Sequence, residues 1–329
     1  MQAQSQYGYL DNIRKNHGAE KCKTAFSQSY QRNKAGAIAL VNDPRLSFPC
    51  LFVLWPLIDS LGLHRRLKPR HMLVLSLCRQ FLKPGSSTRS GPVTNADDAA
   101  RKALKWMLET GYAEDGLNPE FDQILDVTAA LLLSIFRDSD ALKHTVELIF
   151  LRAKKNGYIH DLVWALFKSR DTLALKLVAE RLPSENAQEA ELAKELLNLD
   201  ELDEVGSEND PTKQYAAYIE WLENNDPYLY FTQEGFQYSS KPVFSAVDVE
   251  RKYLQKANPA HTKAPLVPAS EQEAAILATF KPLSKEEKAL LSAYSQRKKK
   301  ENASEWESWI RSSLAEQIDA MQPGKEDFV

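Results

Sequence analysis

Residues 118–157 read NPEFDQILDVTAALLLSIFRDSDALKHTVELIFLRAKKNG, and this stretch decides the fold class. Asn118 followed by Pro119 is typical of a helix N-terminus, because asparagine caps free backbone amides and proline lacks one. Apolar residues recur every three or four positions as far as Phe136. Their arc is wide, which predicts a helix covered on two sides. A second helix with a narrower apolar stripe follows, and we expect Gly157 to close it in a left-handed cap.

The same pattern extends through most of the middle of the chain. Helical periods recur over residues 99–111, 162–167, 173–182 and 187–197. The loops between them are short, so helices that follow one another should pack antiparallel. About a third of the chain resembles α-solenoids of the HEAT kind, and residues 135–142 match residues 166–173 at an offset of 31. We expect a mainly α fold, either a HEAT-like α-solenoid or an irregular helical bundle, and this resemblance of architecture implies no function.

The first quarter of the chain is basic and rich in proline. Helix is expected over residues 11–41 and over residues 71–82, and the second of these is apolar on most sides and therefore buried. Between Pro44 and Pro69 the prolines recur too often for a helical period, so no helix is expected there. Residues 83–92 (KPGSSTRSGP) lack a large apolar side chain, which is typical of a linker.

The last third of the chain changes character. Residues 228–240 mix aromatic and polar side chains, which predicts a small aromatic β-hairpin or an ordered loop. Two helices are expected near the C-terminus, each opened by a capping box, Ser284 with Glu287 and Ser304 with Glu307. The organisation expected from the sequence has five parts: a basic helical segment (1–82), a linker (83–93), an acidic helical-stack domain (94–258), a second linker (259–270) and a C-terminal helical hairpin (271–329).

Charge is segregated along the chain, although the formal net charge is only −3. Residues 1–92 hold 14 Lys and Arg against 4 Asp and Glu. Residues 93–260 hold 18 against 30, and residues 261–329 hold 10 against 11. A basic first quarter followed by an acidic middle indicates either a site for an anionic partner or two parts that attract each other or a neighbouring copy.

The positive charge is concentrated in HRRLKPRH at residues 64–71. Arg65, Arg66, Lys68 and Arg70 are the candidate anion-binding residues, because guanidinium groups bind phosphate and carboxylate in pairs of hydrogen bonds. Three interpretations stay open: a phosphate site, a solvated turn between buried elements, or a surface that pairs with the acidic middle. No aromatic residue is interleaved with these charges, as stacking on nucleobases would require.

Metal and nucleophile chemistry find little support in the sequence. Cys50, His64, His71 and Cys78 have residue types that suit zinc, but their spacings differ from paired ligand knuckles. Motifs that bind nucleotides, activate a serine or hold a catalytic zinc (G-x-G-x-x-G, P-loop, G-x-S-x-G and H-E-x-x-H) are absent from the sequence. We therefore expect no metal and no cofactor.

The sequence predicts a cytoplasmic protein without a membrane partner. Three cysteines form an odd, sparse set, which is typical of reduced thiols. The first eleven residues do not form a secretory signal. The most apolar run, residues 51–58, is far shorter than the roughly 20 residues of a membrane span.

Trp306, Trp309 and Ile310 follow one face of the expected last helix and are the candidate partner-binding anchors. Packing against the chain's own core is the alternative for this face. The function expected is that of a non-catalytic helical scaffold or adaptor in a larger intracellular assembly, with proteins or a second copy as partners. The alternatives are nucleic-acid binding by the basic quarter and an enzyme with a dispersed active site near Tyr228–Tyr238.

Overall fold

The computed structural model of the chain describes residues 8–83, 97–111, 117–199, 202, 210–232 and 245–321. The fold is mainly α, which confirms the prediction from the helical periods. The chain divides into two compact units, Met1–Ser169 with Asn186–Leu192 (unit 1) and Arg170–Glu185 with Ala193–Val329 (unit 2). The five-part organisation stays a prediction, and residues 84–93 of its first linker lie outside the described residues.

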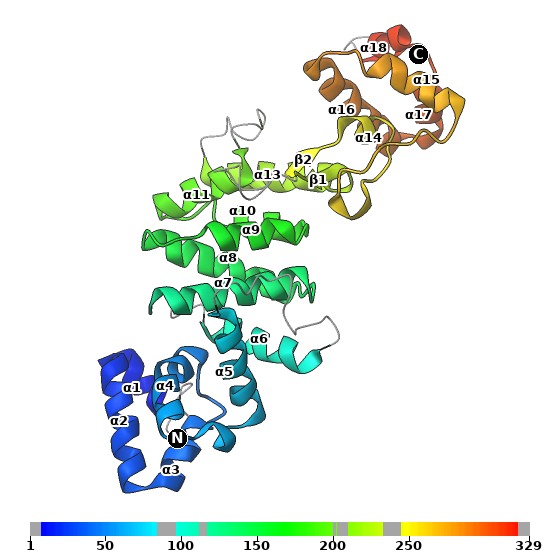
Figure 1. Cartoon of the computed structure of the whole chain (residues 1–329). Coiled ribbons are helices and arrows are strands. Elements are labelled where there is room, and N and C mark those ends of the chain that lie inside the picture. Colours follow the sequence, from blue (N-terminus) through cyan, green and yellow to red (C-terminus); the bar gives the residue numbers. More distant parts are fainter. Residues whose placement is uncertain are drawn as a thin grey trace. The chain divides into compact units, whose positions relative to one another are not determined.

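Unit 1 begins with five α-helices and one 3-10 turn (Figure 1). The central helix is α2, which packs against α1, α3 and α4. The bounds of these elements are α1 (Tyr9–His17), α2 (Ala19–Arg32), α3 (Lys34–Val41), α4 (Phe48–Ser60), η1 (His64–Arg66) and α5 (Pro69–Phe81).

Helix α4 contradicts the expectation that prolines prevent a helix between Pro44 and Pro69. Pro49 lies in its first turn, where the missing amide hydrogen costs nothing. Pro56 lies inside the helix, but its side chain is exposed. The opposite face is buried in the core, and burial of its large apolar residues outweighs the roughly 3 kcal/mol that an internal proline costs.

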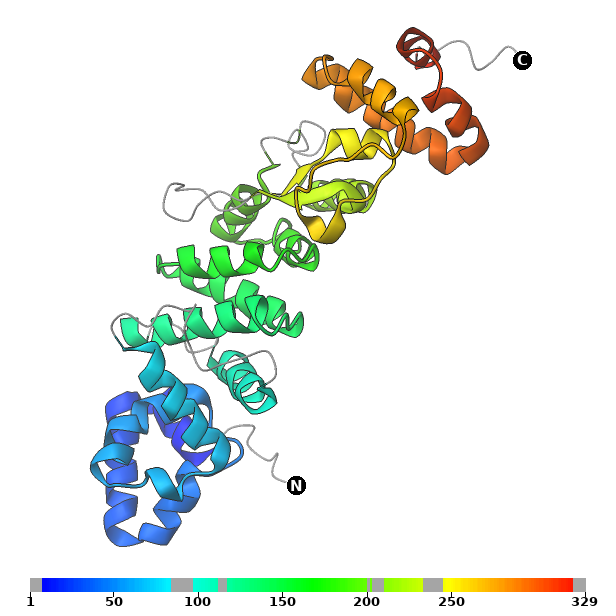
Figure 2. The same ribbon diagram turned by 45° about the vertical axis from the view of Figure 1, so that its right-hand side comes forward.

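The stretch that decides the fold class forms α7 (Pro119–Ser134) and α8 (Asp140–Lys154). Helix α7 packs against α8, α6 (Asp98–Gly111) and α9 (His160–Lys168), so its wide apolar arc is covered on more than one side. Figures 1 and 2 show α7, α8 and α9 side by side. Asn118 caps α7 by accepting a hydrogen bond from the amide of Phe121 at 2.7 Å, as predicted. The repeat and the HEAT-like solenoid stay predictions.

The expectation for Gly157 is wrong in one respect. The residue in the left-handed conformation after α8 is Asn156, with φ of 55°. The amide of Gly157 donates to the carbonyl of Arg152 at 2.8 Å. A Cβ at residue 157 would lie 3.2 Å from that same carbonyl oxygen, a tight contact that glycine avoids.

Unit 2 holds further helices and one short antiparallel sheet. Helix α11 (Ala187–Leu197) belongs to unit 2 from Ala193 onward. The other elements of unit 2 are α10 (Leu173–Ala179), α13 (Pro211–Asn225), η4 (Asp226–Tyr228), β1 (Leu229–Phe231), β2 (Ser245–Val247), α14 (Val249–Tyr253), η5 (Pro259–His261), α15 (Glu271–Phe280), α16 (Lys285–Glu301), α17 (Ala303–Ile310) and α18 (Leu314–Ala320). Strand β1 lies inside the predicted aromatic segment, and its partner β2 lies after it. Residues 233–240 of that segment lie outside the described residues.

The C-terminal helices of unit 2 enclose their own core. Tyr253, Phe280 and Trp309 are buried at its centre, and Leu266 from the expected second linker packs against it. Ser284 and Glu287 form the predicted capping box of α16. The second predicted box is wrong, because Asn302 rather than Ser304 caps α17.

Candidate anion-binding surface

The basic run of the sequence forms the connection between α4 and α5. Its 3-10 turn, η1, is flanked by Leu63 and Leu67, which are buried with 4% and 7% of their surfaces exposed. These two leucines anchor the connection in the core of unit 1. Three cationic side chains are exposed on it, and we call them the basic turn: Arg65, Arg66 and Lys68.

Asn42 fixes the backbone of the basic turn. Its Nδ2 donates to the carbonyl of Arg66 at 2.9 Å, and its Oδ1 accepts from the amide of Lys68 at 2.6 Å. Asn42 follows α3 directly, so the turn is tied to the end of that helix. A carboxamide is the side chain suited to this role, because it offers a donor and an acceptor together. The three cations therefore extend from a backbone that is held in place before any partner binds.

The acids of residues 1–92 form their ion pairs with cations outside the basic turn. Each of the four acids pairs with another cation of the same segment. The pairs, with their nitrogen–oxygen distances, are Asp11 with Arg14 (3.6 Å), Glu20 with Lys23 (2.7 Å), Asp43 with Arg45 (2.8 Å) and Asp59 with Arg79 (2.5 Å). Within the residues that the structure describes, the side chains of the basic turn form no ion pair. Lys68 does lie close enough to Asp43 to help lower the pKa of that carboxyl, so the positive charge of this surface is compensated only in part.

Arg70, the fourth candidate residue, has a different environment. Its guanidinium lies 4.4 Å from the centre of the Trp106 ring, a cation–π contact between α5 and α6. Its Nη2 lies 3.3 Å from Nε2 of His71. Burial lowers the pKa of Arg70. Arg70 thus belongs mainly to the packing beneath the surface, and the basic turn carries the exposed charge.

His71 is held in its neutral form beside Arg70. Its Nδ1 lies 2.9 Å from the carbonyl of Val41, so Nδ1 must carry the hydrogen, and Nε2 must accept from the guanidinium of Arg70. Burial, and after it the positive charge of Arg70, lowers the pKa of His71 to about 4. A proton on Nε2 would face a cation and lose an accepted hydrogen bond.

This arrangement predicts that acid destabilises unit 1 through His71. The pKa of histidine falls from its ordinary value of 6.5 to about 4 on folding. The stabilisation is therefore complete above pH ~6.5, and it is lost progressively as the pH falls toward ~4. Between pH 7 and pH 4 the wild type should lose about 3 kcal/mol more stability than His71→Gln. Urea denaturation at both pH values measures this difference, with His17→Gln, at an exposed position, as the control. Equal losses in wild type and His71→Gln would contradict the assignment.

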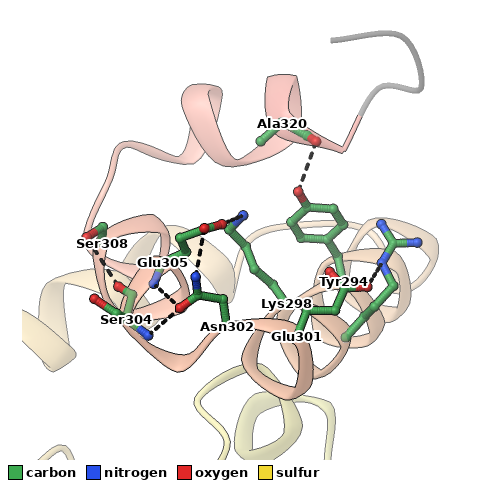
Figure 3. A network of polar contacts seen from close by, with 9 residues as sticks. Tyr294, Lys298, Glu301, Asn302, Ser304, Glu305, Ser308 and Ala320 are labelled. Carbon is green, nitrogen blue, oxygen red and sulfur yellow. Dashed lines mark hydrogen bonds and ion pairs between the residues drawn. The ribbon is translucent and has the colours of Figure 1, made fainter. Parts of the chain in front are cut away.

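A second basic run, residues 297–300, has different surroundings. Figure 3 shows Lys298 beside Glu305, with a distance of 3.4 Å between Nζ and the carboxylate. Arg297 lies over the ring of Tyr294 at 5.0 Å. Lys299 lies over Trp306 at 4.5 Å, and Lys300 donates to Asn224 at 2.7 Å. Each cation of this run has a partner in unit 2, so it is a weaker candidate for an anionic ligand than the basic turn.

The three candidate partner-binding anchors divide into two groups. Trp309 and Ile310 are buried, each with 6% of its surface exposed, and pack in the C-terminal core. Trp306 is half-buried, and its Nε1 donates to Ser295 at 2.9 Å. Trp309 and Ile310 thus follow the alternative of packing against the chain's own core, and only Trp306 retains surface that a partner could contact.

The residues considered for zinc have separate environments. Cys50 contacts Cys22, His71 bonds to Val41, and Cys78 is buried in α5. In the described part of the chain, no group of three or more His, Cys, Asp and Glu residues is placed to hold a metal ion.

A hollow of about 710 Å³ in unit 2 is the other candidate ligand site. It is lined by residues of α13, α14 and α16, including Trp221, Lys252 and Glu301. Lys252 is buried and donates to Asn225 at 2.7 Å. Its lining holds three cations, Lys252, Arg297 and Lys300, and two carboxylates, Glu220 and Glu301, so it favours neither charge of ligand strongly. Of the aromatic segment proposed as an active-site lining, Tyr228 and Phe231 are buried in the core.

The sequence did not reveal the role of Asn42. It precedes Asp43-Pro44, which indicates only the end of a helix. Its contacts lie 24 and 26 residues away along the chain, and no local pattern predicts such pairs. Trp106, the ring beneath Arg70, was predicted as a helix residue but not as part of this surface.

Comparisons with protein-family models, with curated proteins and with solved structures found no match to this chain. None of the described helices combines the length and apolar character needed to cross a bilayer.

Proposed function

We propose that the chain is a non-catalytic helical adaptor that binds an acidic protein surface through the basic turn. One observation carries this proposal: the four acids of the basic segment pair elsewhere, which leaves Arg65, Arg66 and Lys68 exposed and without an ion pair among the described residues. Asn42 holds their backbone in place. A fixed array of cations loses little conformational freedom when a partner binds, and charge complementarity steers the encounter.

The buried polar groups of unit 1 favour an adaptor over an enzyme. Asp126 bonds to Arg152, and His71 bonds to Val41, so both serve the packing of helices. An active site normally leaves such groups open to a pocket. The buried free thiols Cys22, Cys50 and Cys78 also support our placing the protein in the cytoplasm, where thiols stay reduced.

A protein partner is favoured over nucleic acid by the chemistry of the basic turn. Its three cations have no exposed aromatic ring among them on which bases could stack. Trp106, the ring that Arg70 contacts, is buried. The middle of the chain carries 30 acidic against 18 basic residues. This negative charge repels a long polyanion such as a nucleic acid more strongly than it repels a protein with a compact acidic patch.

The test is a triple variant, Arg65→Ala with Arg66→Ala and Lys68→Ala. It should weaken binding of protein partners from the native host by roughly 10- to 100-fold, because exposed interfacial charges contribute about 0.5–1 kcal/mol each. The matched control is Lys21→Ala with Arg32→Ala and Lys34→Ala, which removes the same charge from exposed positions of the same segment. Affinity capture after nuclease digestion, quantified for the three proteins, measures the effect.

The outcomes separate the possible partners. Proteins that the control retains and the triple variant loses, after nuclease digestion, support the adaptor. Concentration-dependent sedimentation abolished by the triple variant identifies a second copy as the partner. Equal losses in both variants show that net charge rather than the basic turn is recognised. Capture of nucleic acid alone, with affinity falling steeply with salt and dependent on the same three residues, would show that the partner class is wrong.

A further inference from the structure

Cys22 and Cys50 form a close pair of thiols inside unit 1. Cys22 lies on α2 and Cys50 lies on α4, and their Sγ atoms are 3.7 Å apart. Neither side chain is exposed. Cys22 also lies 3.6 Å from the carbonyl of Leu10, to which its thiol donates. Packing of α2 against α4 therefore holds the two sulfur atoms in contact, separated by 28 positions along the chain.

The pKa values of the two thiols are shifted in opposite directions. The hydrogen bond from Cys50, and with it the positive charge of Arg14, lowers the pKa of Cys22. The pKa of Cys50 is raised by the same hydrogen bond and by burial. Because the thiolate is the species that reacts with oxidants, Cys22 is the residue expected to react first. Cys78 offers an internal comparison, since it is equally buried and its pKa is raised by burial alone.

We infer that Cys22 and Cys50 are a modification site: a dithiol that a peroxide converts into a disulfide between α2 and α4. The Cys22 thiolate attacks one peroxide oxygen, and the O–O bond breaks to give a sulfenic acid and one water or alcohol. The Cys50 thiol then attacks the Cys22 sulfur, and the S–O bond breaks to release a second water. The two sulfur atoms lose two electrons in total, and the peroxide gains them. Exchange with a small thiol such as glutathione reverses the reaction.

The disulfide has a measurable consequence for unit 1. It closes a loop between α2 and α4, with the two cysteines 28 positions apart, and cross-links of this length restrict the unfolded chain. We expect the melting temperature of unit 1 to rise by on the order of 5 °C in the oxidised protein. The inference does not depend on the proposed adaptor function.

The experiment uses the full reduced chain and hydrogen peroxide. After oxidation, the protein is unfolded and its remaining thiols are alkylated, and the intact mass is then measured. The expected result is the loss of about two hydrogen masses and a single alkylated cysteine, Cys78. Peptide mapping without reductant should find Cys22 joined to Cys50, and treatment with glutathione should restore all three thiols.

Two variants sharpen the test. Cys78→Ser should form the same disulfide at the same rate, with no thiol left to alkylate. Cys50→Ser should leave Cys22 without its resolving thiol, so that the sulfenic acid accumulates and is trapped by dimedone. Alkylation of both Cys22 and Cys50 after peroxide treatment of the wild type, or a cross-link that involves Cys78, would overturn the inference.

Discussion

Asp126→Ala is expected to lower the free energy of unfolding of unit 1 by about 3–5 kcal/mol. Its partner, Arg152, has only 1% of its surface exposed. The Nη1 atom of Arg152 lies 2.5 Å from the carboxylate of Asp126, whereas Nη2 lies 3.5 Å from that of Asp122. Removal of Asp126 leaves a buried guanidinium without the carboxylate that lies 2.5 Å from it. Urea denaturation at pH 7 measures the loss.

The environment of Asp126 explains why the pair is costly to break but contributes little itself. Burial raises the pKa of Asp126 to about 7, against the opposing effect of Arg152. Removing water from the two groups thus offsets most of their attraction. The double variant Asp126→Leu with Arg152→Met should therefore recover about half or more of the loss.

A matched control distinguishes the buried pair from a general effect of charge. Asp122→Ala removes a carboxylate from the same helix and the same arginine, but that side chain is 30% exposed and lies farther away. It should cost about 1 kcal/mol or less. Equal losses for Asp122→Ala and Asp126→Ala, or a double variant less stable than Asp126→Ala, would contradict this account.

The sequence predicted the helices around this pair but not the pair. The period of apolar residues determines where α7 runs and indicates that several neighbours cover it. Asp126 lies within that helix, next to Leu125, and a helix covered on several sides leaves few positions for a solvated carboxylate. The partner lies 26 residues farther along, in α8. Only the tertiary packing selects which arginine reaches it, so no local pattern could have identified Arg152.

Helix α4 shows where local propensity is overridden by packing. The spacing of prolines predicts irregular backbone, because an internal proline removes one hydrogen bond. Phe48, Leu51 and Leu54 are nevertheless fully buried, and Phe48 stacks on Phe121 of α7 at 5.3 Å. These contacts join residues 73 positions apart in the chain. A prediction from neighbouring residues includes the destabilisation of the helix by proline. It does not include the stabilisation by contacts with residues far away in the chain.

The sequence predicted the positive charge of the basic turn but not the surroundings of its side chains. Charge density is a property of composition, so residues 64–71 could be identified directly from the sequence. Whether such a run is neutralised depends on acids that arrive from elsewhere in the fold. The contrast between the basic turn and residues 297–300 arises there. The second run contacts Glu305, Tyr294 and Asn224, whereas the three cations of the basic turn form no ion pair with a described acid.

Phe280→Ala is expected to unfold much of the C-terminal part of unit 2. Phe280 is fully buried and stacks on Tyr253, with ring centres 4.1 Å apart and planes 10° from parallel. Truncation of a buried phenylalanine costs about 3–5 kcal/mol through lost burial and the cavity left behind. Among the described residues, the core that Phe280 joins is small, with eight buried residues, so few other contacts can compensate. Circular dichroism at 25 °C should show lost helix, and limited proteolysis should cut within α15–α18.

Two further variants test whether the filled volume of this core is what matters. Phe280→Leu keeps most of the apolar volume, so it should retain the helices with a loss of about 1–2 kcal/mol. Leu290→Ala, on the neighbouring helix α16, alters a side chain that is 63% exposed and should change stability by less than about 0.5 kcal/mol. The prediction is wrong if Phe280→Ala retains the wild-type helix content and resistance to protease. In that case the C-terminal helices are stabilised mainly by their caps and polar contacts, such as the 2.6 Å hydrogen bond from Tyr253 to Gln317.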